Sequence, residues 1–170
     1  MIELLILFVL QNKVRTMYGI SKEIYNTFSI LTTPSFGTIQ PALKRLLDAG
    51  FLNAKKELSE GGRRSIYYSI TKDGLDELKR MLMLPPLENP INFLTTARIK
   101  LYCTNLLTPD EGKVLFKSLK LKAQSILIDT ENQIKSKNTD FYQRMILDNL
   151  ICEYKNFITL LEGFEHAGNN

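Results

Sequence analysis

Two short segments of alternating polar and apolar residues, joined by a glycine pair, constrain the fold of this chain more than any other feature. They span 51–58 and 65–70, and Gly61 and Gly62 in the turn supply the positive φ that tight hairpins need. Three helical segments precede this hairpin, and a fourth helix, which Thr71 caps, follows it to about residue 84. Three helices and a β-hairpin in this order predict a winged helix-turn-helix.

The first two helices are predicted from their apolar faces. Residues 2–11 are apolar on nearly every side, which indicates a helix that is buried on more than one side. Residues 19–28 place Ile20, Ile24 and Phe28 on one face at four-residue spacing, which predicts a short amphipathic helix.

The start of the third helix has two interpretations. If Thr38 is the N-cap, Pro41 falls in the first turn, where its missing N–H has no cost. If Ser35 is the N-cap, the helix must bend near Gly37. In both cases the helix reaches residue 49, where Gly50 favours a left-handed C-cap.

The third helix has one apolar face and one face that suits DNA. At 100° per residue, Ile39, Leu43, Leu46 and Leu47 gather on one side and predict the buried face. The far side carries a hydroxyl and two cations, from Thr38, Lys44 and Arg45, and the amide of Gln40 lies at the boundary between the two faces. In a major groove such side chains meet base edges and phosphates. An ordinary solvated helix fits this pattern equally well.

The hairpin adds a second cluster of cations, which comprises Lys55, Lys56, Arg63 and Arg64. A wing laid along DNA would use them on phosphates or in a narrow minor groove, and the alternative is a solvated turn. Residues 1–84 contain 12 Lys and Arg against 8 Asp and Glu, whereas residues 85–170 contain 10 of each. A phosphate-rich partner therefore fits the first half of the chain.

The second half is predicted to be helical throughout. Pro85, Pro86 and Pro90 separate it from the first half, so we expect a winged-helix domain over 1–84 and a helical dimerisation domain over 85–170. Its last helix carries an apolar seam with alternating spacings of three and four: Leu147, Leu150, Tyr154, Phe157, Leu161 and Phe164. This seam and the apolar residues beside it predict a homodimer through the C-terminal helices.

Three stretches of the first half resemble the PadR-like family of transcriptional regulators. Residues 34–46, PSFGTIQPALKRL, resemble the family's recognition helix, and residues 60–71, EGGRRSIYYSIT, resemble its wing. Residues 17–20, MYGI, are similar to its entry into the second helix. The resemblance implies a dimeric winged-helix protein, usually a repressor, on a palindromic operator in double-stranded DNA. It implies DNA contacts from Tyr18, Ser21, Ser35, Thr38, Gln40, Lys44 and the Arg63–Arg64 wing. The family often has Tyr where Gln40 stands.

Other functions find less support. No nucleophile–base pair, phosphate loop or metal-ligand cluster is evident, so we expect no enzyme, no cofactor and no metal site. Cys103 and Cys152 are far apart, and the apolar start lacks the basic region of a signal peptide, which predicts a cytoplasmic protein without a membrane span. A winged helix that binds protein would have an uncharged wing, and another winged-helix regulator family stays open as an alternative.

An effector is the last expectation. Six aromatic residues in the second half either fill the core or line a cavity for an apolar, uncharged aromatic ligand. They are Phe93, Tyr102, Phe116, Tyr142, Tyr154 and Phe157.

Overall fold

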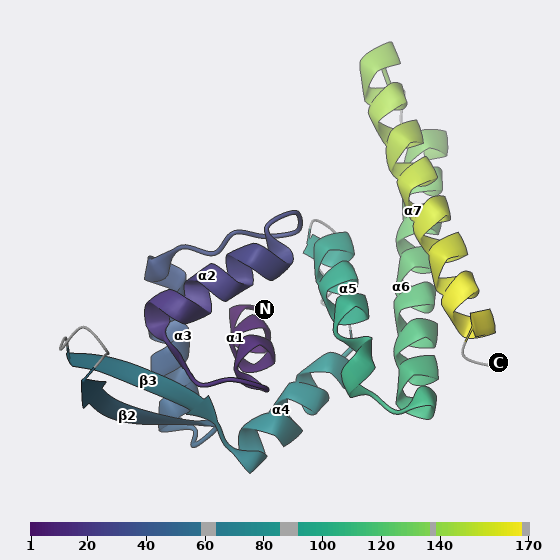
Figure 1. Ribbon diagram of the computed structural model, residues 1–170. Helices are drawn as coiled ribbons and strands as arrows, with labels where there is room; N and C mark the ends of the chain where they lie inside the picture. Colours follow the sequence, from purple (N-terminus) through teal and green to yellow (C-terminus); the bar gives the residue numbers. More distant parts are fainter. Residues whose placement is uncertain (59–63, 86–91, 137–138, 168–170) are drawn as a thin grey trace. The chain divides into compact units, whose positions relative to one another are not determined.

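A computed structural model describes residues 1–58, 64–85, 92–136 and 139–167 (Figure 1). The chain forms two compact units. The first unit comprises Met1–Leu84 and Arg98–Leu106, and the second comprises Pro85–Ala97 and Leu107–Asn170. The first unit thus contains the segment 98–106, which the expected division assigned to the second half of the chain.

The first unit is a winged helix-turn-helix, as the sequence predicted. Its elements in chain order are α1 (Ile2–Leu10), β1 (Arg15–Thr16), α2 (Met17–Phe28), α3 (Phe36–Asp48), β2 (Leu52–Leu58), β3 (Arg64–Ile70) and α4 (Lys72–Met83). The three strands form an antiparallel sheet in the order β1-β3-β2. The two-residue strand β1, which pairs Arg15 with Tyr68 and Thr16 with Tyr67, was not predicted.

The core of this unit forms around α1, which contacts α2, α3 and α4 (Figure 1). Leu5, Ile6 and Leu7 are fully buried, in agreement with a helix that is apolar on nearly every side. Most residues of the predicted apolar faces of α2 and α3 are buried, namely Ile20, Ile24, Phe28, Ile39, Leu43 and Leu46, whereas Leu47 is half-buried. Burial of such side chains stabilises a fold by roughly 1.5–3 kcal/mol each, so this face fixes the position of α3.

The start of α3 follows the second of the two interpretations. Ser35 is the N-cap, and the Thr38 hydroxyl donates a hydrogen bond of 2.9 Å to the Ser35 carbonyl. Pro41 therefore lies inside the helix, which runs on to Asp48. Because proline has no N–H, the helix loses one backbone hydrogen bond there. The helix ends as predicted, with Gly50 at a φ of 76°.

Thr71 connects the wing to α4, as the sequence predicted. Its hydroxyl oxygen accepts a hydrogen bond from the Gly74 N–H at 3.0 Å and donates one to the Gly50 carbonyl at 2.9 Å. Gly74 packs so closely against Phe51 that a Cβ there would lie 2.2 Å from the Phe51 carbonyl oxygen. Both residues hold the N-terminus of α4 against the turn that enters β2.

The second unit is a long helical hairpin, α6 (Pro109–Ser136) and α7 (Phe141–Ala167). Thr108 begins α6 with a capping box, because the Thr108 N–H donates to the Glu111 carboxylate and the Glu111 N–H donates to the Thr108 hydroxyl. The helix α5 (Phe93–Tyr102) precedes this hairpin and is followed by the 3₁₀ turn η2 (Thr104–Leu106).

The helix α5 contributes to both units. Phe93, at its start, packs on Tyr154 and Phe157 of α7 with ring centroids 6.2 and 6.0 Å apart. Its last residues belong to the first unit, where Tyr102 contacts Phe8 and Phe28 edge to face. These ring contacts explain why 98–106 departs from the expected domain division.

Lys100 strengthens the attachment of this segment to α4. Its side chain is buried, and its ammonium donates hydrogen bonds to the carbonyls of Leu82 at 3.1 Å and Leu84 at 2.5 Å. These carbonyls stand at the C-terminal end of α4, where a cation is favourable. Burial nevertheless lowers the pKa of Lys100 to about 8.

The centre of the predicted seam on α7 is covered within the single chain, and the role of the seam in dimerisation stays a prediction. Tyr154, Phe157 and Leu161 are buried, and Phe164 stacks on Phe116 of α6. The spacing of the seam correctly gave the apolar face of α7, but α5 and α6 of the same chain cover its centre. Leu147 and Leu150, closer to the start of α7, remain half-buried.

No helix within the described ranges is long and apolar enough to cross a membrane.

Candidate nucleic-acid interface

The face of α3 that is turned away from the core is open to solvent. Thr38 and Lys44 are exposed, as the sequence predicted for the side turned away from the core, and Ser35 and Gln40 are exposed as well. The Ser35 and Thr38 hydroxyls lie 3.1 Å apart within hydrogen-bond distance, so they are held together at the N-terminal end of the helix. That end also carries the positive pole of the helix, which favours phosphate.

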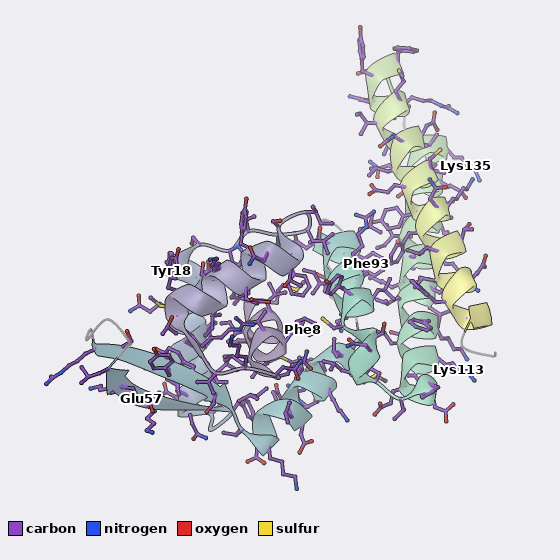
Figure 2. The ribbon with its side chains drawn as sticks, viewed as in Figure 1. Phe8, Tyr18, Glu57, Phe93, Lys113 and Lys135 are labelled. Atoms are coloured by element: carbon purple, nitrogen blue, oxygen red, sulfur yellow. The ribbon has the colours of Figure 1, made fainter. Side chains whose placement is uncertain are left out.

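A groove runs beside this face, between α3, the start of α2 and the wing. It has a volume of about 640 Å³, and its walls include Tyr18, Gln40, Arg64 and Tyr68. Tyr18 is 68% exposed and points outward from the first turn of α2 (Figure 2). A phenol, an amide and a guanidinium from three elements therefore border one concave surface. Hydrogen bonding to base edges and to phosphate is the chemistry that these groups offer.

Tyr68 lines the groove and is half-buried, and this burial raises the pKa of its phenol, so the hydroxyl stays protonated as a donor. Tyr67 lies on the other face of the sheet.

The register of the hairpin separates the predicted wing cations. Lys56 is paired with Ile66, on the sheet face that also carries Tyr68 and Arg64. Lys55 is paired with Tyr67 on the opposite face, where its ammonium lies 2.6 Å from the Glu57 carboxylate. Lys56 and Arg64 therefore share the face that borders the groove, and Lys55 does not. Arg63 lies outside the described residues.

Two further residues that were predicted to contact DNA, Arg45 and Ser21, have other surroundings. Arg45 is exposed, but its Nε is 2.6 Å from the Glu3 carboxylate of α1. Ser21 is half-buried on α2. The sequence gave no signal for the Glu3 contact, because the two residues are 42 positions apart.

Arg15 is a residue of this region that sequence reasoning did not single out. Its Nε donates to the Val9 carbonyl at 3.1 Å, and its guanidinium lies 3.0 Å from the Glu23 carboxylate. Arg15 thus joins the end of α1, the middle of α2 and, through β1, the wing strand β3. The next residue, Thr16, caps α2 by accepting the Gly19 N–H. The arrangement fixes the entry of α2, where Tyr18 stands.

Comparison with known proteins identifies the family. Residues 6–80, which span this winged-helix arrangement, match the family described as transcriptional regulator PadR-like. The winged-helix part of the chain therefore belongs to the PadR-like family of transcriptional regulators, in agreement with the resemblance seen in the sequence. No curated protein matches the chain at a significant level.

Several solved structures are similar to this PadR-family chain. Bacillus subtilis PadR in complex with operator DNA is 20% identical over 98% of each chain, with a TM-score of 0.45. The same protein in complex with p-coumaric acid is 21% identical over 99% of each chain, with a TM-score of 0.43. Smu.1704 from Streptococcus mutans UA159 is 31% identical over 47% of this chain and 71% of that chain, with a TM-score of 0.42.

Proposed function

We propose that this PadR-family regulator binds double-stranded DNA in a sequence-specific manner, with α3 in the major groove and the hairpin as a wing on the backbone. The observation that carries the proposal is the groove in which Tyr18, Gln40 and Arg64 converge from three elements. The amide of Gln40 suits bidentate pairing with an adenine edge, whereas Arg64 and Lys56 suit phosphate. Ser35, Thr38 and Lys44 extend the contact along α3, and Ser21 adds a hydroxyl on α2.

The chain acts as a homodimer in this proposal. The interface is the far half of the α6–α7 hairpin, which comprises α6 after Ile126 and α7 before Tyr154. Among the described residues, no side chain is fully buried in α6 after Ile126 or in α7 before Tyr154. The same region exposes large apolar side chains to 55–78%, namely Ile128, Phe141, Tyr142, Met145 and Ile146. An apolar surface of this size requires cover, and a second copy of the helical hairpin would bury it.

Two copies related by a twofold axis would place two recognition helices on one side of DNA. We therefore propose a palindromic operator whose half-sites are about 10 base pairs apart, or a multiple of that spacing. Repression follows where such an operator overlaps a promoter, because the bound dimer excludes the polymerase.

The effector expected from the sequence needs a different site and a different chemistry. Phe93, Tyr154 and Phe157 pack on one another, and Tyr142 is 78% exposed, so they line no common cavity in the described chain. A cavity of about 460 Å³ instead lies within the first unit, bordered by Phe8, Tyr102, Arg15, Glu23, Asn12 and Asn105. Its wall combines rings with hydrogen-bonding groups. We infer that an effector is a planar ring with polar substituents, not a purely apolar molecule.

Selection of bound duplexes from a random pool tests the main proposal. We expect an enriched palindrome, and in vitro transcription from a promoter that carries it should fall when the protein is added. A pool without enrichment would contradict sequence-specific binding. Enrichment of a single half-site would contradict the dimer and leave the recognition helix in place.

A further inference from the structure

The two cations of α3 are neighbours in sequence, yet their surroundings differ. Lys44 is exposed, and no carboxylate of the described chain is paired with it. Arg45 is paired with Glu3 at 2.6 Å, and the Arg45 side chain is 59% exposed. The exposed end of Arg45 can therefore turn away from Glu3 toward another anion, since within the described residues a single ion pair holds it.

Glu3 is fixed much more firmly than Arg45. It lies in the first turn of α1, where the positive end of the helix favours a carboxylate, and its side chain is only 26% exposed. The residues that follow it, Leu4 to Leu7, are buried in the core. The carboxylate is therefore held in place beside the recognition helix, whereas the arginine is free to exchange partners.

An exposed ion pair of this kind contributes little to stability, so a competing anion can replace one partner at small cost. DNA phosphate is such an anion, and each phosphate that a cation neutralises releases condensed counterions. A cation that is already paired within the protein contributes less to this release, because its charge is offset before DNA arrives.

We propose that Glu3 competes with DNA phosphate for Arg45, so that the first helix of the chain limits how tightly the recognition helix holds DNA of any sequence. This inference rests on the proposed DNA binding. In this proposal Arg45 contacts a DNA phosphate only when it leaves its ion pair with Glu3, so Glu3 reduces the contribution of Arg45 to DNA binding. Phosphate contacts carry no sequence information, so the limit acts on operator and unrelated DNA alike.

The test measures the salt dependence of DNA binding for four full-length variants by fluorescence anisotropy, on the selected operator and on an unrelated duplex of equal length. Glu3→Gln should bind both duplexes several-fold more tightly. Its plot of log affinity against log salt should be steeper by about 0.9, the value for one additional phosphate contact. Glu77→Gln is the matched control, because Glu77 forms a similar pair with Arg80 on α4. It should leave both quantities close to those of the parent.

Arg45→Gln and the double variant Glu3→Gln/Arg45→Gln decide whether Glu3 acts through Arg45. With Arg45 absent, removal of the Glu3 carboxylate should change neither affinity nor slope. An effect of equal size in the Arg45→Gln background, or an equal effect of Glu77→Gln, would overturn the inference in favour of general charge. The inference would also be overturned if the parent binds DNA and Glu3→Gln leaves the slope of log affinity against log salt unchanged. A parent that binds neither duplex would instead contradict the proposed function itself.

Discussion

Lys55 and Lys56 are adjacent in β2, but their side chains leave opposite faces of the wing sheet. Lys56 shares its face with Arg64 and Tyr68, next to the groove beside α3, whereas Lys55 is paired with Glu57 on the other face. In the sequence the two lysines are equivalent members of one basic cluster. The antiparallel register separates them, because side chains alternate between the two faces of a strand.

Lys56→Ala and Arg64→Ala should each weaken binding to all DNA sequences and flatten the salt slope by about 0.9, for one lost phosphate contact. Lys55→Ala should leave the slope unchanged, because its ammonium is paired with Glu57 on the far face. The three substitutions are measured by anisotropy over a salt series. Equal losses for Lys55→Ala and Lys56→Ala would show that the wing approaches DNA differently.

Gln40→Ala should relax specificity at one base pair and leave the others unchanged. Gln40 borders the groove and is the exposed amide of α3, so its loss should cost roughly 1–3 kcal/mol at the base pair that it reads. Competition between the operator and its single-base-pair variants gives the measurement. A uniform loss across all variants would mean that Gln40 contacts the backbone and not a base.

The far half of the α6–α7 hairpin should control assembly. Ile146→Asp places a charge at a side chain that is 65% exposed in the single chain and should convert the dimer into a monomer. Val114→Asp, at a site that is 58% exposed near the start of α6, is the control and should stay dimeric. Light scattering distinguishes 19.5 kDa from twice that mass. A parent protein of 19.5 kDa at micromolar concentration would rule out this interface.

Local signals in the sequence were enough for most of the winged helix. Thr71 as a cap and Gly50 as a left-handed terminus depend on neighbouring residues only, and both were predicted. The strand β1 was missed because two residues carry no periodicity and form a strand only by pairing with β3. The seam on α7 also depends on contacts that the local sequence does not contain. Periodicity identifies an apolar face, but whether the same chain or a second copy covers it depends on contacts such as Phe93 with Tyr154.

In the candidate site, too, some features follow from the local sequence and others depend on tertiary packing. The exposed face of α3 follows from helical geometry, so Thr38 and Lys44 were placed correctly on the surface, whereas Gln40, expected at the boundary, is exposed. The pairing of Arg45 with Glu3 joins residues 42 positions apart and depends on how α1 packs on α3. No local pattern contains that information.

Lys100 should make the stability of the protein rise between about pH 8 and pH 10.5. Burial lowers its pKa from 10.5 to about 8, so in this range the unfolded chain binds the proton more tightly than the folded one. Folding therefore becomes more favourable as the pH rises toward 10.5, and this gain is lost as the pH falls to 8. The full effect is on the order of 3 kcal/mol, from about 1.4 kcal/mol per unit of pKa.

Lys100→Met is the control for this prediction, since it removes the titrating group and keeps an unbranched side chain. Urea unfolding at a series of pH values gives the free energy of unfolding for both proteins. The difference between parent and variant should change across this pH range, which cancels the contribution of other lysines and tyrosines. A constant difference would show that the ammonium is solvated in the folded protein.

The cavity beside Arg15 should bind a small planar molecule with polar groups. Arg15 and Glu23 offer a donor and an acceptor, while Phe8 and Tyr102 offer ring surfaces. An occupant that engages Arg15 acts on β1, and hence on the wing strand β3 and on the Thr16 cap of α2. We choose 4-hydroxybenzamide as the probe, because it is uncharged, planar and both donates and accepts hydrogen bonds.

Thermal unfolding with this probe measures the binding. At ten times the dissociation constant a ligand stabilises the folded state by about 1.4 kcal/mol, which should raise Tm by several degrees. Asn12→Trp, at the exposed rim of the cavity, should abolish this rise, whereas Asn26→Trp, exposed on α2 outside the cavity lining, should keep it. The probe should change the operator affinity of the parent protein, and it should leave the operator affinity of Asn12→Trp unchanged. A Tm that does not respond to 10 mM probe, or that responds equally in the two tryptophan variants, would remove this cavity as the effector site for molecules of this class.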